Sequence, residues 1–269
     1  MGFVDLQRPR DHVALVTLNR PERMNAMAFD VMVPLREALE ELAHDHGVRV
    51  VVLTGAGEGF CSGADQKNPG RAPGVHGLPH PAAGLRAMRH LEDVVEDLRA
   101  LPQPVIAAVN GAAIGGGLCL ALSCDIRIAG RAAYFRAAGI TNGLTASELG
   151  LSYLLPRAVG TSRAFDIMLT GRDVDGDEAT RIGLVSECVD DEDLLDRCYE
   201  IAERIAALSR LGIEMTKRTL WDGLDAASLR QHMHYESVGQ VYARLLTDNF
   251  EEAVQARAEG RRPRFRDTR

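Results

Sequence analysis

Short apolar segments alternate with amphipathic segments along the first half of the chain. Val13–Asn19, Val48–Leu53 and Val105–Asn110 are valine-rich apolar runs, and the nearly continuous run at Val48–Leu53 is typical of a strand covered on both faces. Between them, Asp30–His46 and Leu85–Leu98 carry apolar residues at helical spacing. This alternation predicts a layered α/β unit with right-handed crossovers.

A glycine triplet precedes the next predicted helix. In Gly111–Asp125 (GAAIGGGLCLALSCD), glycines stand at 115 to 117, the helix is expected over Gly115–Ser123, and the strand-like DIRIAG follows. Free backbone N–H groups at a helix start attract an anion or a polarised carbonyl oxygen, and glycines allow close approach. The alternative is that the glycines only permit tight helix–strand packing. A second N–H donor could come from the turn FCSGAD after the preceding strand.

The second half of the chain is predicted to be mostly helical. From Ser147 onward the exception is the apolar stretch Leu184–Val189, and the strongest helical patterns cover Asp190–Leu208 and Ala226–Leu246. Earlier, the prolines and glycines of Lys67–Gly84 predict an irregular loop. A loop of this length is either a functional lid or a tolerated surface insertion, and both interpretations stay open.

Composition narrows the class of protein. The chain has 269 residues, 46% of them hydrophobic, and a net charge of −7, which argues against a general nucleic-acid surface. Its longest apolar run is too short to cross a bilayer, and the N-terminus lacks a signal pattern, so we expect a cytoplasmic protein. The histidines show no ligand spacing and the 5 cysteines form no CxxC pair, so we expect reduced thiols and no metal.

Cys61 lies in a segment, Gly59–Gly63 (GFCSG), with the spacing of a nucleophile elbow. Such an elbow joins a strand directly to a helix. Here the predicted strand ends too early and no helical pattern follows, so Cys61 is interpreted as a small buried filler.

Several motifs together resemble the crotonase (enoyl-CoA hydratase/isomerase) superfamily. They are VALVTLNRPERMNAM, GFCSGAD, PVIAAVNGAAIGGGLCLALSCDIRIAG, LSYLLPRAVGTSRAFDIMLTGR and ATRIGLVSECV, in the family's order over nearly the whole chain. The resemblance implies an α/β fold, a crotonase-like spiral of ββα repeats with a helical C-terminal trimerisation region. It places the acyl-CoA-binding core at residues 1–190 and the oligomerisation helices at 191–269, and it implies a homotrimer or a hexamer made of two trimers.

By the same resemblance, two backbone N–H groups stabilise an enolate-like thioester oxyanion, and these fall on Ala64 and Gly116. The CoA moiety is expected to lie against a set of backbone-rich positions: Met24, Ala26, Ala64, Asp65, Gln66, Lys67 and Gly116. The Asp65 side chain is expected to stabilise a turn rather than to catalyse. Arg261 in the basic tail is a weak candidate for a CoA phosphate contact from a neighbouring subunit.

The sequence departs from the family's hydratases at their two glutamates. The first position is Cys119 and the second aligns with Gly139; a protonated thiol is a poor base and glycine has no side chain. Other branches, such as the dienoyl-CoA isomerases, carry an aspartate farther along, where SELG places Glu148. Glu148 is therefore the candidate acid/base. The alternative is an early helix residue after a Ser147 or Thr145 cap.

The resemblance implies an acyl-CoA-processing enzyme of enoyl-CoA hydratase/isomerase type that works through an enolate, with Glu148 as its single acid/base. Alternatives are a double-bond isomerase, a CoA-thioester hydrolase and a non-catalytic acyl-CoA-binding protein. No cofactor beyond the CoA of the substrate, no nucleic acid and no membrane partner is expected.

Overall fold

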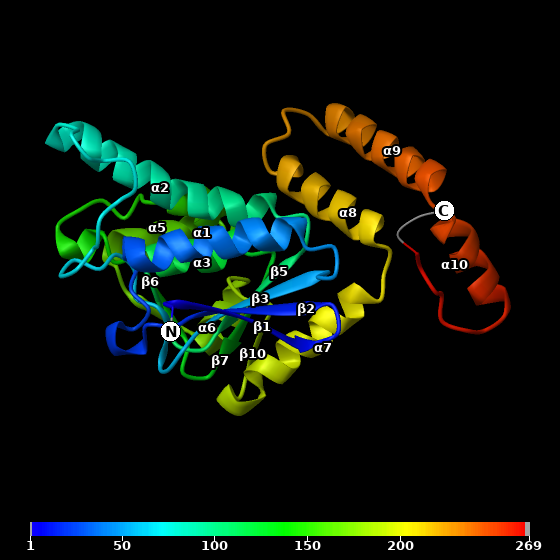
Figure 1. Cartoon of the computed structure of the whole chain (residues 1–269), viewed down its shortest axis with the longest axis horizontal. Helices are drawn as coiled ribbons and strands as arrows, with labels where there is room; N and C mark the ends of the chain where they lie inside the picture. Colours follow the sequence, from blue (N-terminus) through cyan, green and yellow to red (C-terminus); the bar gives the residue numbers. More distant parts are fainter. Residues whose placement is uncertain (1, 267–269) are drawn as a thin grey trace.

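The strands form two sheets in a computed structural model that describes residues 2–266 (Figure 1). The six-stranded sheet has the order β1 (Val4–Arg10), β2 (Val13–Leu18), β3 (Val50–Gly55), β5 (Val105–Val109), β7 (Ile126–Gly130), β10 (Glu187–Val189). The four-stranded sheet has the order β4 (Gly59–Cys61), β6 (Ala112–Ile114), β8 (Tyr134–Arg136), β9 (Asp173–Asp175). Neighbouring strands are parallel except in the pairs β1/β2 and β8/β9.

Successive strands alternate between the two sheets. β3, β5 and β7 are neighbours in the larger sheet, and β4, β6 and β8, which follow each of them in the chain, are neighbours in the smaller sheet. Each successive pair of strands, one in the larger and one in the smaller sheet, therefore adds the next neighbouring strand to both sheets. Repeating this step makes the chain a spiral. This arrangement confirms the predicted crotonase-like α/β spiral, and it differs from a doubly wound fold, which has one sheet.

The passage from one sheet to the other requires a close backbone approach. Between β5 and β6 the chain has only Asn110 and Gly111, and a Cβ on Gly111 would lie 2.0 Å from the Glu58 carbonyl oxygen. The Asn110 side chain donates to the Gly57 carbonyl (2.9 Å) and so ties this corner to the preceding one. Glycine at this corner is thus a steric requirement.

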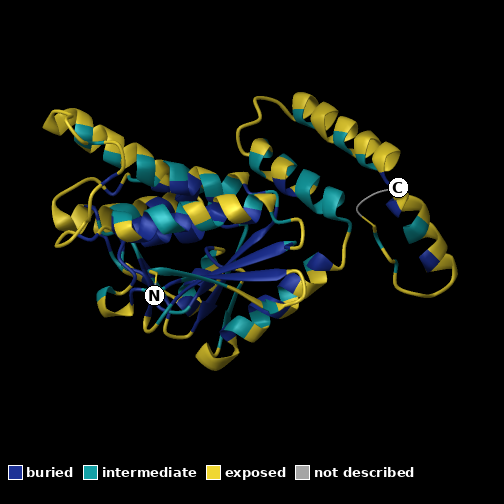
Figure 2. Cartoon of the chain, viewed as in Figure 1, coloured by how far each residue is buried: buried dark blue, intermediate teal, exposed yellow. Residues whose placement is uncertain are grey.

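Both faces of the larger sheet are covered. Helices α1 (Phe29–His44), α2 (His80–Ala100) and α3 (Gly116–Ser123) pack with Val51 and Leu53 of β3 in one core cluster. On the other face, α7 (Leu194–Ala206) packs with Val50 and Val52. Figure 2 shows the buried strands between these helices. The prediction of a strand buried on both faces at Val48–Leu53 is confirmed, although the strand begins and ends two residues later, at Val50–Gly55.

The short helix η1 (Pro21–Arg23) lies between β2 and α1. The remaining helices belong to the second half of the chain: η2 (Ile140–Asn142), α4 (Leu151–Val159), α5 (Thr161–Thr170), α6 (Gly176–Ile182), η3 (Asp191–Asp193), α8 (Arg210–Gly223), α9 (Leu229–Leu246) and α10 (Asn249–Ala258). Helices α8 to α10 lie to one side of the sheets (Figure 1). The division at residue 190 stays a prediction; α7, which follows it, packs on the sheet of the core.

The predicted loop Lys67–Gly84 is too long. Irregular chain ends at Pro79, and His80–Gly84 form the start of α2. Pro81 is tolerated there because N–H groups in the first helical turn have no intrahelical partner. The sequence patterns also missed β1 and the four short strands of the smaller sheet, and they placed the start of α7 four residues early, at Asp190 instead of Leu194.

A buried ion pair attaches α8 to the core. Lys217 is 6% exposed, and its ammonium group lies 3.0 Å from an Asp125 oxygen and donates to the carbonyls of Gln103 (2.9 Å) and Leu98 (3.3 Å). Asp125 also accepts from the Trp221 indole (2.7 Å) and the Val105 N–H (2.7 Å). Burial lowers the pKa of Lys217 from its usual value, and Asp125 opposes that shift.

We expect Asp125→Asn to lower the free energy of unfolding by about 3 kcal/mol, because it leaves the buried Lys217 cation without a counter-charge. Urea denaturation measures the loss. The double variant Asp125→Asn/Lys217→Met is the control and should lose less than the single variant. A single variant as stable as the parent would contradict the role of the pair.

Candidate functional site

Ala64 lies in a turn after β4 that pairs with the chain around Met27. The Met27 N–H donates to the Gly63 carbonyl (2.7 Å), and the Asp65 N–H donates to the Met27 carbonyl (3.1 Å). Met27 and Ala64 thus form a parallel bridge in which both polar groups of Met27 are used by the residues beside Ala64. The N–H of Ala64 itself points away from Met27.

Gly116 is the first residue of α3 and lies next to this turn. A Cβ on Gly63 would be 3.4 Å from the Gly116 nitrogen and 2.6 Å from the Ile114 carbonyl oxygen. No hydrogen bond found within residues 2–266 has the N–H of Ala64 or of Gly116 as donor. The structure therefore brings two unpaired backbone donors to adjacent turns, which is the arrangement an oxyanion-binding site needs.

Glu148 lies beside the same helix start. Its Oε1 atom is 3.1 Å from the place where a Cβ on Gly115 would stand. The side chain is half-buried, and this burial raises the pKa of the carboxyl above its usual value. Because α4 begins at Leu151 with Gly150 as its N-cap, Glu148 is outside the helix, and the alternative that it is a capped early helix residue is wrong.

Neither position where hydratases of the family carry glutamate supplies a base. Cys119 is fully buried, burial raises the pKa of its thiol well above the usual value, and its Sγ donates to the Glu148 carbonyl (3.4 Å). A Cβ on Gly139 would lie 1.9 Å from the Thr145 carbonyl oxygen, so the backbone there admits no side chain.

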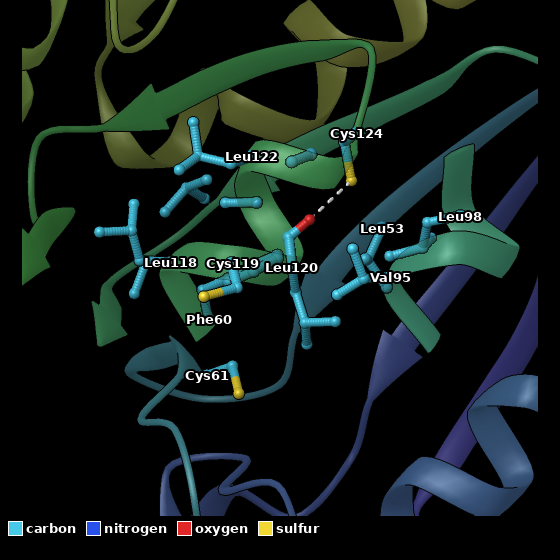
Figure 3. Packing of buried hydrophobic residues seen from close by; sticks show 14 of the residues in the cluster. Leu53, Phe60, Cys61, Val95, Leu98, Leu118, Cys119, Leu120, Leu122 and Cys124 are labelled. Atoms are coloured by element: carbon cyan, nitrogen blue, oxygen red, sulfur yellow. Dashed lines mark hydrogen bonds between the residues drawn. The ribbon is translucent and has the colours of Figure 1, made fainter. Parts of the chain in front are cut away.

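Cys61 ends β4 beneath the glycine triplet. It is fully buried, and burial raises the pKa of its thiol to about 12, so the thiol is unreactive near neutral pH. Cys61 and Cys119 belong to one buried apolar cluster with Phe60 and Leu118. Figure 3 shows Cys119 next to Phe60 and Leu118, with Cys61 below them. These contacts match the interpretation of Cys61 as a filler. All 5 cysteines are free thiols.

The Asp65 carboxylate organises the turn that carries Ala64. It is 1% exposed and lies 2.6 Å from Arg23 and 3.1 Å from Arg20. One of its oxygens accepts from the N–H groups of Lys67 (3.0 Å) and Asn68 (2.9 Å). The hydrogen bond from Arg23 is the main cause that holds the pKa of Asp65 far below its usual range. These contacts match the turn-stabilising role expected for this side chain.

The positions predicted to hold CoA lie along this turn and the segment that faces it. Met24 and Asn25 are both in the left-handed region, with φ of 48° and 54°. Asn25, which the sequence patterns did not single out, is fully buried and bonds the Arg20 N–H and the carbonyls of Ala56 and Gly59. Ala26 is buried, whereas the side chains of Gln66 and Lys67 are exposed.

Arg261 is already engaged within its own chain. Its guanidinium donates to both oxygens of Glu252 (2.6 and 3.0 Å) and pairs with Glu259. The predicted contact with a CoA phosphate stays a prediction and would require these pairs to open. Within residues 2–266, no group of three or more His, Cys, Asp or Glu side chains could hold a metal ion. None of the helices in that range is long and apolar enough to span a membrane.

Comparisons with known proteins give a consistent result. The family model described as Enoyl-CoA hydratase/isomerase matches residues 8–268. A protein of Mycobacterium tuberculosis named "Probable enoyl-CoA hydratase EchA12" is 67% identical over 99% of this chain and 94% of its own length. A solved Mycobacterium abscessus structure, described as a probable enoyl-CoA hydratase/isomerase, is 66% identical, with a TM-score of 0.96 and 100% of both chains covered.

A second solved structure, described as a monofunctional enoyl CoA isomerase from M. smegmatis, is 65% identical. Its TM-score is 0.75, and the match covers 87% of this chain and 99% of that one.

We expect Asp65→Asn to destabilise the protein by about 1–3 kcal/mol at neutral pH, because the new amide group would face partners that are all donors. The pKa of Asp65 is lower in the folded state, so this carboxylate stabilises the fold above its unfolded pKa of about 3.9 and loses that effect as pH falls below it. The stability gap between parent and variant should therefore narrow in acid.

Urea unfolding at several pH values measures this gap. Asp173, whose exposed carboxylate pairs with Arg136, provides the control: Asp173→Asn should cost less than about 1 kcal/mol. A gap for Asp65→Asn that is the same at all pH values would refute the assignment.

Proposed function

The chain belongs to the enoyl-CoA hydratase/isomerase family, and from this premise we propose that it moves a double bond within an enoyl-CoA thioester. The observation that supports this proposal is the single carboxylate. Glu148 stands beside the Gly115–Gly116 helix start, while Cys119 and Gly139 supply no second one. Carrying a proton from one carbon to another requires one acid/base group, whereas the family's hydratases use two glutamates to position a water.

In the first step the thioester carbonyl oxygen of a 3-enoyl-CoA accepts hydrogen bonds from the Ala64 and Gly116 N–H groups. The Glu148 carboxylate then removes a proton from the α carbon. The electron pair of that C–H bond moves into the thioester, and the negative charge collects on the oxygen between the two amides. Because these donors are held by the fold, they stabilise the dienolate without reorganisation, and each contributes about 2.7–4 kcal/mol.

In the second step the same carboxyl group, now protonated, returns its proton to the γ carbon. The double bond then lies between the α and β carbons, no water is consumed, and Glu148 is again a carboxylate. Burial raises the pKa of Glu148, which makes it a stronger base than an exposed glutamate and suits it to both halves of the transfer.

Two observations bear on the alternatives. The M. tuberculosis relative is named a probable enoyl-CoA hydratase, and hydration would need Glu148 alone to orient and deprotonate water. The M. smegmatis relative is described as a monofunctional enoyl CoA isomerase, which supports the isomerase branch. Thioester hydrolysis would use Glu148 as nucleophile or water activator. A purely acyl-CoA-binding role would leave the Glu148 carboxylate without a function.

The exposed apolar side chains of the C-terminal helices support the expected homotrimer or hexamer. Large side chains remain 46–74% exposed at one set of α9 positions: Leu229, Met233, Val238, Val241, Tyr242, Leu245 and Leu246. A second copy of the chain would remove this apolar surface from water.

Chromatographic separation of the products, followed by mass spectrometry, tests the reaction, because the 2-enoyl and 3-enoyl esters have the same mass and differ only in retention. With 3-enoyl-CoA, 2-enoyl-CoA and dienoyl-CoA of several chain lengths, we expect 2-enoyl-CoA from the 3-enoyl substrate and no 3-hydroxyacyl-CoA. Glu148→Gln should lower turnover at least ~10²-fold and abolish deuterium uptake at the α carbon, because an amide cannot exchange the proton. The affinity for the CoA ester should barely change.

A hydroxyacyl product from the parent protein would favour the hydratase, and free CoA would favour the hydrolase. Full turnover by Glu148→Gln would eliminate the assignment of this acid/base.

The second prediction concerns the Gly116 donor. Gly116→Pro removes the N–H at a position where a helix tolerates proline, and kcat should fall ~10²–10³-fold. Gly116→Ala is the matched control, because it keeps the N–H but adds a Cβ that would lie 2.3 Å from the Met27 sulfur. If both variants fold and lose the same activity, sterics explain the loss and the donor role is wrong.

A further inference from the structure

We propose that Cys119 and Leu149 are positioning residues that hold the Glu148 carboxylate at a fixed place beside Gly115, at the start of the helix that carries the Gly116 N–H. This inference rests on the proposed role of Glu148 as acid/base. Glu148 lies on an irregular segment, whereas the Gly116 donor lies on helix α3, so contacts between the two segments must fix their relative position.

Cys119 connects the backbone of Glu148 to helix α3. The Glu148 carbonyl accepts two hydrogen bonds, one from the Leu151 N–H (2.7 Å) and one from the Cys119 thiol (3.4 Å). The bond from Leu151 is local and closes the turn that leads into α4. The bond from Cys119 joins residues 29 positions apart and attaches that turn to the helix that begins with Gly116.

Leu149 supplies a second attachment through its backbone conformation. Its φ is 44°, in the left-handed region, which costs a leucine about 1–2 kcal/mol. The side chain is nevertheless 8% exposed, and its Cδ1 lies 3.3 Å from where a Cβ on Gly116 would stand. Such a conformation persists when the surrounding packing holds it. Leu149 therefore turns the chain so that the preceding side chain, Glu148, faces Gly115.

Helix α3 is the common frame for both groups. Gly116 and Cys119 are three residues apart, so the donor and the thiol that binds Glu148 occupy one helical turn. All eight residues of Gly116–Ser123 are buried, whereas 141–145, just before Glu148, are exposed. The distance between the oxyanion donor and the carboxylate is thus set by buried helix rather than by exposed loop.

The energetic consequence follows from the proximity requirement of proton transfer. Displacing a catalytic group by about 1 Å costs up to ~10²-fold in rate. A carboxyl released from Gly115 would also reach water, and its pKa would fall toward the usual value, because burial is the cause of the present upward shift. The adjacent Cys119 thiol is neutral near pH 7, since burial raises its own pKa well above the usual value.

The experiment compares Cys119→Ala and Leu149→Ala with the matched control Cys124→Ala. Cys124 is also a fully buried thiol, directly after α3, but its Sγ donates to the Leu120 carbonyl (3.3 Å; Figure 3) and does not contact Glu148. Each variant is measured by thermal unfolding, by kcat and KM with 3-enoyl-CoA, and by carboxyl ¹³C NMR titration. The Glu148 signal is assigned by its loss in Glu148→Gln.

We expect Cys119→Ala and Leu149→Ala to lower kcat ~10-fold with little change in KM and to lower the pKa of Glu148. Cys119→Ser keeps a donor and should retain more of both properties than Cys119→Ala. Cys124→Ala should change neither kcat nor the pKa of Glu148, even if it lowers thermal stability as much as Cys119→Ala does. If Leu149→Ala does not fold, the comparison of Cys119→Ala with Cys124→Ala tests the proposal.

A Cys119→Ala protein with the kcat and the Glu148 titration of Cys124→Ala would overturn the proposal. That result together with an inactive Glu148→Gln would leave the proposed function intact. Conversely, an active Glu148→Gln would refute the catalytic role, while the titration would still report whether Cys119 and Leu149 hold the carboxyl.

Discussion

The close approach of two backbone turns, Cys61–Ala64 and Ile114–Gly117, is the constraint on which the rest of the site depends. A Cβ on Gly117 would lie 1.9 Å from the Cys61 carbonyl oxygen, and one on Gly63 would lie 2.6 Å from the Ile114 carbonyl oxygen. Only glycines allow this contact. It brings the N–H groups of Ala64 and Gly116 to neighbouring positions and leaves both without an acceptor among residues 2–266.

A site built from backbone contacts leaves little room for side-chain chemistry. At Gly139 the Thr145 carbonyl occupies the place of a side chain, and at Cys119 a thiol is buried and hydrogen-bonded to the Glu148 backbone. The remaining acid, Glu148, stands in partly desolvated surroundings that raise its pKa. On this combination rests the proposal of proton transfer within a bound thioester, since activation of water requires further polar groups to orient it.

Helix α3 links this site to the C-terminal helices. Its first turn carries Gly116 and Cys119, and directly after its last turn Asp125 accepts from Trp221 and pairs with Lys217 of α8. A single buried helix thus joins the candidate site at one end to the attachment of α8 at the other. The ion pair is satisfied by backbone and indole partners, as a buried charge requires.

Local patterns in the sequence were sufficient to locate α1, α2, α7 and α9, though not all of their ends, and also β3 with its two buried faces and the glycine triplet at the start of α3. Glu148 was also identifiable, because it is the one carboxylate in an otherwise weakly polar stretch. Each of these signals is carried by neighbouring residues, since burial imposes its period directly on the sequence.

The tertiary structure decided the remaining features. The smaller sheet consists of three-residue strands, too short to show a period, and they exist because they pair with strands tens of residues away. The left-handed Leu149 contradicts the local preference of leucine, and the link from Cys119 to Glu148 spans 29 positions. Contacts between distant segments stabilise both, so no local pattern could have predicted them.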